Sequence, residues 1–445
     1  MNLTGANVLV VGMAESGDAA AELLAQKGAR VTATDLKPLA ELPGLAPKLE
    51  RWGVAFAPQT PEAFLGRDLI VLAPGVPYDL PELTAERERG VEVIGEVELA
   101  GWFLQGPIAG VTGSNGKSTT TRLLYEMLRA ARIPAQVGGN IGRPVCRMVA
   151  GSGPEQWNVL ELSSFQLESI KTFSAHIGLG LNLTDNHLDR HQTMTSYAQA
   201  KAKLFANQSP AGAAVLNADN AYTRSFADLT PAEVIWFSTH NKLTRGAWLQ
   251  DDELYLDGAP LLLVSEIRIR GRHNAANVLA AAAAARRAGA SLEAIREAAG
   301  QFTRLEHRLE FVATRGGVDW YNDSKATTVA SAIAAVESFP PGGLWVILGG
   351  KDKGSDFTPL RAPLAERAKG VLLIGKAAEK IGAQIGCGED CHDLATAVTR
   401  AVAQAQPGDT VLLAPACASF DQFTSFEHRG RVFKELVAGL KEERA

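Results

Sequence analysis

Cysteine is scarce in this chain of 445 residues: there are four, and no two of them form a Cys-x-x-Cys pair. Cys387 and Cys391 are separated by three residues, and no pair of histidines accompanies them at the spacing of a zinc site. We therefore expect free thiols, as is typical of a protein in a reducing compartment.

Long apolar runs and an excess of positive charge are also missing. No run reaches the ~18 apolar residues that a membrane span needs, and the first residues show neither the basic segment nor the apolar core of a signal peptide. The net charge of -5 provides no general positive field for nucleic acid. We therefore expect a cytoplasmic protein with no membrane span and no nucleic-acid partner.

The most informative stretch that is present is Gly-Val-Thr-Gly-Ser-Asn-Gly-Lys-Ser-Thr, residues 110–119. An apolar, strand-like segment precedes it, and apolar residues at helical spacing follow. A strand, a glycine-rich turn and a helix N-terminus together form a phosphate-binding loop, in which Lys117 neutralises the outer phosphates and Ser118 places its hydroxyl on Mg²⁺. The predicted nucleotide-binding residues of this loop are Gly113, Ser114, Asn115, Gly116, Lys117, Ser118 and Thr119.

The loop departs from a strict Walker A sequence at one position, where Val111 replaces the first glycine. The alternative is a glycine-rich turn followed by a surface lysine, and the residues alone leave it open. The flanking strand and helix favour the phosphate site.

The first hundred residues predict a strand–helix–strand unit with strands at 7–12 and 30–35, a helix at 19–26 and a further strand at 68–72. Gly12 and Gly17 are spaced Gly-x-x-x-x-Gly, without the middle glycine of a dinucleotide fingerprint. A nucleotide other than NAD fits this better, with Ser16 donating to phosphate and residues 35–37 reaching a base or sugar. A unit with a packing glycine and no ligand is the open alternative.

The middle of the chain carries candidate metal ligands. Residues 157–166 predict a short strand. Within it Glu161 lies in an apolar setting, where a carboxylate is costly unless it meets a cation such as Mg²⁺. His187 follows a predicted strand in a polar loop and is a candidate ligand of a second metal ion. Lys201 has small neighbours, which favours a buried side chain. Residues 136–142 predict a flexible turn that carries the amide of Asn140.

The last stretch again alternates strands with helical segments, which predicts a parallel sheet. Polar clusters follow three of its strands, at residues 323–327, 351–353 and 419–423. Parallel sheets bind ligands at the carboxyl ends of their strands. The fold class is therefore α/β with three domains, each on a mainly parallel sheet: a Rossmann-like domain at 1–105, a central P-loop ATPase domain at 106–305 and a Rossmann-like domain at 306–445.

Three motifs together resemble the Mur ligase family: the loop at 113–119, the segment Glu161-Leu-Ser-Ser-Phe-Gln-Leu and the segment His187-Leu-Asp-Arg-His. The clusters at 323–327, 349–353 and 414–423 are similar to those of the D-glutamate-adding members, and this similarity covers all three domains. It implies an ATP-dependent ligase of peptidoglycan precursor synthesis that joins D-glutamate to UDP-N-acetylmuramoyl-L-alanine through an acyl phosphate and a tetrahedral intermediate. It also implies two Mg²⁺ ions.

The resemblance implies roles for individual residues. A lysine at the place of Lys201 is carbamylated in the family and becomes a metal ligand. Catalytic roles are implied for Lys117, His187, Lys201 and Lys325. The implied ATP contacts outside the loop are Asn274, Asn277, Arg308 and Asp323. The implied contacts with the UDP-linked substrate are Ser16, Asp35, Lys37, Gly75, Asn140 and His187. The implied contacts with D-glutamate are Thr327, Lys353, Ser419 and Phe426. The implied metal ligands are Ser118, Glu161, His187 and carbamylated Lys201.

Three other functions stay open at this point. Folylpolyglutamate synthetase resembles the last two domains but lacks a UDP-binding first domain. An NAD-dependent dehydrogenase would explain Gly12 and Asp35 but would leave Lys117 without a role. A nucleotide-gated binding protein needs only the phosphate loop and has no use for the cluster at 323–327.

Overall fold

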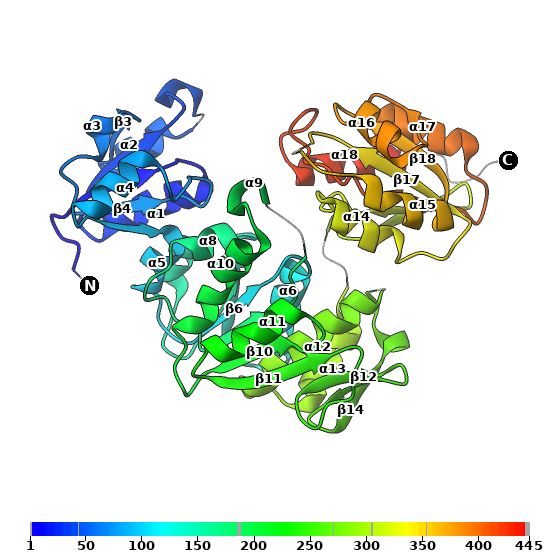
Figure 1. Cartoon of the computed structure of the whole chain (residues 1–445), viewed down its shortest axis with the longest axis horizontal. Helices are drawn as coiled ribbons and strands as arrows, with labels where there is room; N and C mark the ends of the chain where they lie inside the picture. Colours follow the sequence, from blue (N-terminus) through cyan, green and yellow to red (C-terminus); the bar gives the residue numbers. More distant parts are fainter. Residues whose placement is uncertain are drawn as a thin grey trace. The chain divides into compact units, whose positions relative to one another are not determined.

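The computed structural model describes residues 2–42, 44–184, 188–269, 271–303, 306–352 and 354–440. Within these ranges the strands form three sheets, and each sheet is built from consecutive strands of the sequence (Figure 1). By their contacts the residues divide into two compact units. The first unit holds the first two sheets, and the second holds the last sheet together with residues 184–192 and 268–274.

The first sheet is parallel throughout, in the order β3-β2-β1-β4-β5. Its central strand is an uninterrupted apolar run with residues 8–11 fully buried, as expected of a parallel strand covered on both faces. The elements are β1 (Asn7–Val11), α1 (Glu15–Gln26), β2 (Arg30–Asp35), α2 (Ala46–Trp52), β3 (Ala55–Pro58), α3 (Pro61–Phe64), β4 (Leu69–Leu72), α4 (Pro81–Glu88), β5 (Glu92–Gly95) and α5 (Glu96–Gly101).

The second sheet has the order β14-β13-β12-β11-β10-β9-β6-β8-β7. It is parallel from β7 to β12, and β13 and β14 add an antiparallel edge. Its strands are β6 (Ile108–Thr112), β7 (Ala135–Gly139), β8 (Trp157–Glu161), β9 (Ile177–Gly180), β10 (Ala213–Asn217), β11 (Glu233–Ser238), β12 (Ala247–Gln250), β13 (Glu253–Leu256) and β14 (Ala259–Leu263). Its helices are α6 (Lys117–Ala130), α7 (Val145–Met148), α8 (Ser164–Glu168), α10 (Met194–Ala206), α11 (Ala221–Ser225), α12 (Arg272–Arg287) and α13 (Leu292–Gln301). The short helix α9 (Leu188–His191) belongs to the second unit.

The third sheet has the order β15-β16-β20-β17-β18-β19, with β15 antiparallel and the other strands parallel. Its strands are β15 (Glu310–Arg315), β16 (Val318–Asn322), β17 (Leu344–Gly349), β18 (Ala368–Ile374), β19 (Glu389–Asp390) and β20 (Thr410–Leu413). Its helices are α14 (Val329–Val336), α15 (Arg361–Arg367), α16 (Ala378–Ile385), α17 (Leu394–Gln404) and α18 (Phe426–Ala438). The fold class predicted from the sequence, three α/β domains on mainly parallel sheets, is confirmed.

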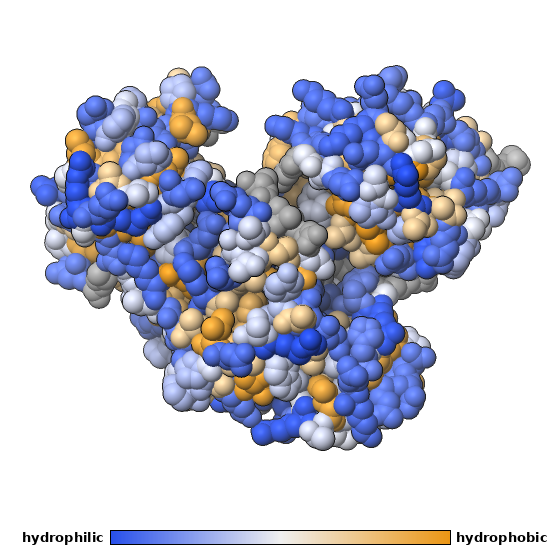
Figure 2. All heavy atoms as spheres, in the orientation of Figure 1, coloured by the Kyte–Doolittle hydropathy of each residue, from blue (hydrophilic) through white to orange (hydrophobic). Residues whose placement is uncertain are grey.

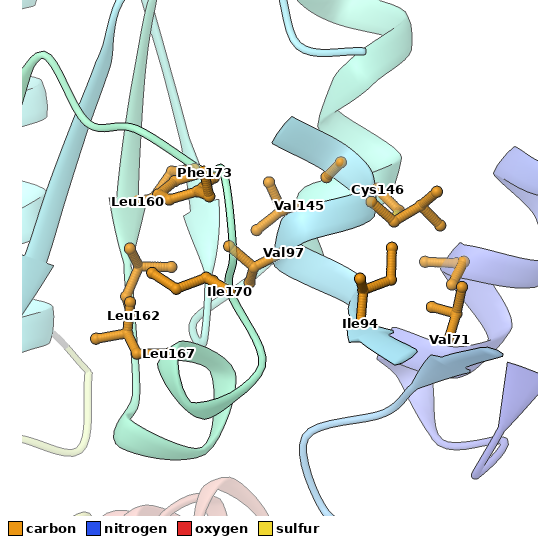
Figure 3. Close-up of a cluster of buried hydrophobic side chains, with 14 of the residues drawn as sticks. Val71, Ile94, Val97, Val145, Cys146, Leu160, Leu162, Leu167, Ile170 and Phe173 are labelled. Atoms are coloured by element: carbon orange, nitrogen blue, oxygen red, sulfur yellow. The ribbon is translucent and has the colours of Figure 1, made fainter. Parts of the chain in front are cut away.

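A buried apolar cluster joins the first sheet to the second within the first unit (Figure 3). Among its members are Val71, Ile94, Val97, Val145, Leu160 and Phe173. Two buried carboxylates on α5 reinforce the joint. Glu98 accepts hydrogen bonds from the backbone N–H groups of Lys171 (2.7 Å), Thr172 (2.9 Å) and Phe173 (2.9 Å). Glu96 accepts one from the N–H of Cys146 at 2.6 Å.

The two carboxylates of the joint respond differently to burial. Burial would raise the pKa of Glu98, but the hydrogen bonds from Thr172, Lys171 and Phe173 outweigh it and lower that pKa. For Glu96 burial dominates over the hydrogen bonds from Cys146 and Val145 and raises the pKa to about 7. One carboxyl oxygen of Glu96, Oε2, is buried without a hydrogen-bond partner.

Three local predictions were wrong. Residues 135–139 form strand β7 and not part of a flexible turn. A side chain at Gly139 would lie 2.3 Å from the carbonyl oxygen of Glu161, so glycine permits close pairing with β8. Helix α1 begins at Glu15 rather than at residue 19, which places Ser16 in its first turn. Strand β8 ends at Glu161, because Ser163 and Gln166 form a reciprocal capping box that starts α8.

Two broader expectations concern the thiols and membrane spans. All four cysteines are free. Within the described ranges, no helix combines the length and the apolar character needed to cross a membrane. Figure 2 shows hydrophilic residues over most of the visible face, with hydrophobic residues in small scattered groups.

Candidate functional site

The phosphate-binding loop lies between β6 and α6 at the carboxyl edge of the second sheet. The ammonium of Lys117 arches back over the loop and donates to the carbonyl oxygens of Gly113 (2.8 Å) and Ser114 (2.9 Å). Helix α6 starts directly after Gly116 without a side-chain cap, so its N-terminal N–H groups and helix dipole are directed at the loop. This is the arrangement expected of an anion site.

Asn277 joins the loop from helix α12. Its Oδ1 accepts a hydrogen bond from the hydroxyl of Thr120 at 3.2 Å, and both residues are buried. A side chain at Gly116 would come within 2.2 Å of the same Oδ1, and Gly116 has φ of +84°. Glycine is therefore required at 116 both by the backbone and by the approach of Asn277. The other predicted ATP contact on this stretch, Asn274, is buried, and its Nδ2 lies 3.1 Å from Nε2 of His273.

Glu161 ends strand β8 beside the start of the loop, where it pairs in register with Val111. Its carboxylate is 1% exposed, and Oε1 accepts a hydrogen bond from Nδ2 of Asn140 at 2.8 Å. The backbone N–H of Asn140 also donates to the Glu161 carbonyl at 2.8 Å. The structure thus brings together a predicted metal ligand and a predicted substrate contact.

Lys201 is buried in helix α10, as its small neighbours predict. Its Nζ lies 3.4 Å from the hydroxyl of Thr112 and 4.7 Å from the ring centre of Tyr197. Burial, reinforced by the positive charge of Lys117, holds the pKa of Lys201 well below its usual value, although Glu161 opposes the shift. The shift increases the neutral fraction of this lysine, and the neutral amine is the form that reacts with CO₂.

The donor set fits Mg²⁺ in part. Ser118 and Glu161 both offer buried oxygen atoms, and Mg²⁺ is commonly held by one or two such protein ligands together with phosphate oxygens and water. Among the residues that the structure describes, no three His, Cys, Asp or Glu side chains gather into a metal cluster. His187, the predicted ligand of a second ion and substrate contact, lies outside the described residues.

Four of the six predicted contacts with the UDP-linked substrate lie at or follow the carboxyl ends of strands in the first sheet: Ser16, Asp35, Lys37 and Gly75. Asp35 at the end of β2 accepts from the N–H of Met13 (2.6 Å) and of Lys37 (3.0 Å), which ties it to the loop after β1. A side chain at Gly12 would lie 2.8 Å from Val76, so the loops after β1 and β4 are in contact. Ser16 is half-buried, and Lys37 and Gly75 are exposed at this edge. A side chain at Gly17 would lie 1.8 Å from the carbonyl oxygen of Gly12, so this glycine allows the two backbone segments to pack closely.

In the second unit the three polar clusters follow β16, β17 and β20, as predicted. Lys325 has its Nζ 4.9 Å from the ring centre of Phe426, and its N–H donates to the carbonyl of His307 at 3.2 Å. Arg308, next to His307, is half-buried, and Asp323 is buried. This end of the sheet therefore gathers one predicted catalytic residue with predicted ATP and D-glutamate contacts.

The remaining D-glutamate contacts lie on the neighbouring loops. Ser419 is buried, and its carbonyl accepts from the N–H of Phe423 at 2.9 Å. The N–H of Thr327 donates to the Lys325 carbonyl at 2.8 Å. Lys351 and Ala418 form a bridge between the loops after β17 and β20. Lys353, predicted to hold the glutamate side chain, lies outside the described residues.

Comparison with known proteins identifies the family. Residues 6–95 match the Mur ligase MurD-like N-terminal domain, 111–285 the Mur ligase middle domain and 307–417 the Mur ligase glutamate ligase domain. Proteins named UDP-N-acetylmuramoylalanine–D-glutamate ligase from Solibacter usitatus and Koribacter versatilis are 57% and 46% identical to the chain. The first alignment covers 99% of both chains, and the second covers 100% of this chain and 99% of the other.

The chain belongs to the Mur ligase family.

Solved structures agree with the fold of this Mur ligase. A pseudomurein peptide ligase type C from Methanothermus fervidus has a TM-score of 0.62 at 18% identity, covering 98% of this chain and 99% of the other. UDP-N-acetylmuramate-alanine ligase from Thermotoga maritima has a TM-score of 0.61 at 18% identity, covering 97% and 99%. At this identity the likeness concerns the three-domain fold.

The sequence did not reveal two residues that organise the sites of this Mur ligase. Arg429 is fully buried and donates to the hydroxyl of Ser324 (2.9 Å) and the carbonyls of Ser324 (2.9 Å) and Cys417 (3.1 Å). Burial lowers the pKa of Arg429 to about 10, while Cys417 and Asp421 oppose the shift. Asn182 accepts a hydrogen bond through Oδ1 from the N–H of Asn115, in the phosphate-binding loop, at 2.9 Å. The only sequence signal for either was a polar residue in an otherwise apolar or helical setting.

Proposed function

We propose that this Mur ligase joins D-glutamate to UDP-N-acetylmuramoyl-L-alanine at the expense of ATP, in peptidoglycan precursor synthesis. The observation that carries the proposal is the full-length similarity, at 57% identity, to a protein named for this reaction. The MurD-like match at residues 6–95 supports a UDP-binding first domain and disfavours a folylpolyglutamate synthetase. The domain limits that we propose are 1–105, 106–305 and 306–445.

The first chemical task is to activate a carboxylate, which is a poor electrophile. Transfer of the γ-phosphoryl group of ATP to one carboxylate oxygen forms an acyl phosphate and ADP. The two reacting groups are both anions, so their approach requires neutralisation. Lys117, which arches over the loop, and the N-terminal N–H groups of α6 supply fixed positive charge there.

Mg²⁺ fits the same place. When bound by Ser118 and Glu161, it would neutralise phosphate charge and polarise the transferred group. Asn140 donates to Glu161 and so fixes the orientation of this carboxylate. We further propose that Lys201 is carbamylated and that His187 contributes to a second metal site. The lowered pKa of Lys201 supports the first of these, because it increases the fraction of neutral amine.

The second task is attack by the amine of D-glutamate on the acyl carbon. The tetrahedral intermediate then expels phosphate and leaves the amide. We assign Lys325, Thr327, Ser419, Phe426 and Lys353 to this half of the reaction. Lys325, Thr327 and Phe426 lie at one end of the third sheet, which supports a shared site. Because ATP is consumed, we infer that the ligase works in the cytoplasm, and we propose that it is a monomer.

Phosphate release tests the proposal. Protein, Mg-ATP and UDP-N-acetylmuramoyl-L-alanine are combined with D-glutamate, L-glutamate, L-lysine or no amino acid. We expect release only with D-glutamate, together with a product of the matching mass. Lys117→Met is expected to abolish release, whereas Lys203→Met, on the surface of α10, serves as the control and keeps it. Equal release with and without an amino acid would contradict the ligase assignment.

A further inference from the structure

A short segment after strand β9 lies against the phosphate-binding loop. We name residues 181–183 the clamp segment. The carbonyl of Asn182 accepts a hydrogen bond from the N–H of Ser114 at 2.7 Å. The side chain of Asn182 forms two more, because Oδ1 accepts from the N–H of Asn115 at 2.9 Å and Nδ2 donates to the Asn115 carbonyl at 3.1 Å. One residue therefore fixes three backbone groups of the loop.

The approach is close enough to favour glycine at position 113 of the loop. A side chain at Gly113 would lie 3.0 Å from Cβ of Leu181 and 3.3 Å from the backbone N and O of Asn182. The N–H of Leu181 also donates to the carbonyl of Thr112 at 3.1 Å, which continues the pairing of β6 and β9 beyond the strands. The clamp segment and the loop are thus packed together and hydrogen-bonded along their length.

The clamp segment is itself held from the other side. Asn217, at the end of β10, donates through Nδ2 to the carbonyl of Leu181 at 2.7 Å. Asn220 donates through Nδ2 to the carbonyl of Leu183 at 3.0 Å and caps α11. The apolar side chains of Leu181 and Leu183 are buried on either side of Asn182. The amide of Asn182 is consequently presented to the loop from a fixed backbone.

An amide is the side chain that this position needs. It must accept from one backbone N–H and donate to one backbone carbonyl of the same residue, and only asparagine and glutamine carry both groups in this fork. The loop also lacks the first glycine of a strict Walker A sequence: that position is Val111, which belongs to strand β6. The hydrogen bonds from Asn182 therefore constrain the shape of the loop from outside it.

We propose that Asn182 is a positioning residue that holds the phosphate-binding loop in the shape that binds ATP. The proposal rests on the proposed function of this loop as the ATP site. Asn182 acts through the backbone of Ser114 and Asn115, so its loss should weaken ATP binding and leave the binding of the UDP-linked substrate largely intact.

The test compares three variants. Asn182→Ala removes both side-chain hydrogen bonds. Asn182→Asp keeps the acceptor but sets a negative charge against the Asn115 carbonyl and beside the phosphates. Asn207→Ala is the matched control, because Asn207 also donates its amide to backbone carbonyls, those of Lys171 (2.7 Å) and Phe173 (3.3 Å), away from the loop. KM for each substrate, kcat, the Kd for ATP by calorimetry and the urea unfolding midpoint are measured.

For Asn182→Ala we expect KM and Kd for ATP to rise about ten-fold, as two ordinary hydrogen bonds allow, with less than a two-fold change for the UDP-linked substrate. Asn182→Asp should weaken ATP binding further, and Asn207→Ala should match the wild type in KM and Kd for ATP. Unchanged ATP affinity in both Asn182 variants would overturn the proposal, and so would an equal rise for every substrate with a lowered unfolding midpoint. If the wild type binds ATP but forms no amide, the proposed function fails, whereas the calorimetric comparison still decides the role of Asn182.

Discussion

Replacement of the buried carboxyl at the joint between the first two sheets has a calculable effect on stability. Glu96 is 1% exposed, accepts the N–H of Cys146 and has one oxygen without a partner. Burial raises its pKa from 4.5 to about 7. As pH rises, the unfolded chain loses this proton first, so the folded state binds more protons in this window and the free energy of unfolding falls.

The magnitude follows from the width of that window. At about 1.4 kcal/mol per pH unit, the rise in pKa from 4.5 to about 7 removes about 3 kcal/mol of stability by pH 8. Glu96→Gln keeps an acceptor for the Cys146 N–H but cannot ionise. The variant should therefore match the wild type at pH 4.5 and exceed it at pH 8 by up to about 3 kcal/mol.

Urea unfolding at the two pH values measures this difference. The control is Glu92→Gln, which changes an exposed carboxylate that pairs with Lys171 at 3.5 Å and should shift stability by less than about 1 kcal/mol at either pH. A Glu96→Gln variant that is less stable than the wild type at pH 8 would refute the reasoning. It would mean that the hydrogen bonds of the carboxylate outweigh the cost of burying its charge.

Three further predictions concern the sites. Gly116→Ala should raise KM for ATP at least ten-fold, because the new side chain meets Asn277 and φ is positive; normal kinetics would contradict this. Lys201→Met should cut turnover more than 100-fold without lowering the urea midpoint, because methionine fills a similar volume and has no amine that must be kept from water in this buried place; a large loss of stability would contradict it. Arg429→Met should destabilise the second unit by about 3 kcal/mol, because Ser324 and its neighbours lose their donors; an unchanged thermal midpoint would argue against this role.

Short-range patterns predicted much of the fold and part of the candidate site. The phosphate loop is continuous in sequence and lies between a strand and a helix whose periodicities are clear, so its place was predictable. The polar clusters after β16, β17 and β20 were predictable for the same reason, because each adjoins its strand. Lys201 was expected to be buried from the small residues around it, and it is.

The features that the sequence did not predict depend on distant partners. Asn182 bonds to Asn115, which lies 67 positions earlier, and Arg429 bonds to Ser324, 105 positions earlier. Neither partner can be chosen before the sheet order is known. Strand β7 was interpreted as a turn because its glycines usually mark turns, whereas here Gly139 allows close packing against Glu161 and Gly138 against Met148.

Transfer of ¹⁸O tests the central claim most directly. UDP-N-acetylmuramoyl-L-alanine labelled with ¹⁸O in both carboxylate oxygens is incubated with Mg-ATP and D-glutamate, and the released phosphate is analysed by mass. Activation through an acyl phosphate predicts one ¹⁸O atom in each phosphate, formed together with the amide product. Phosphate without ¹⁸O would show that ATP is cleaved by water and would contradict ligation by carboxylate activation.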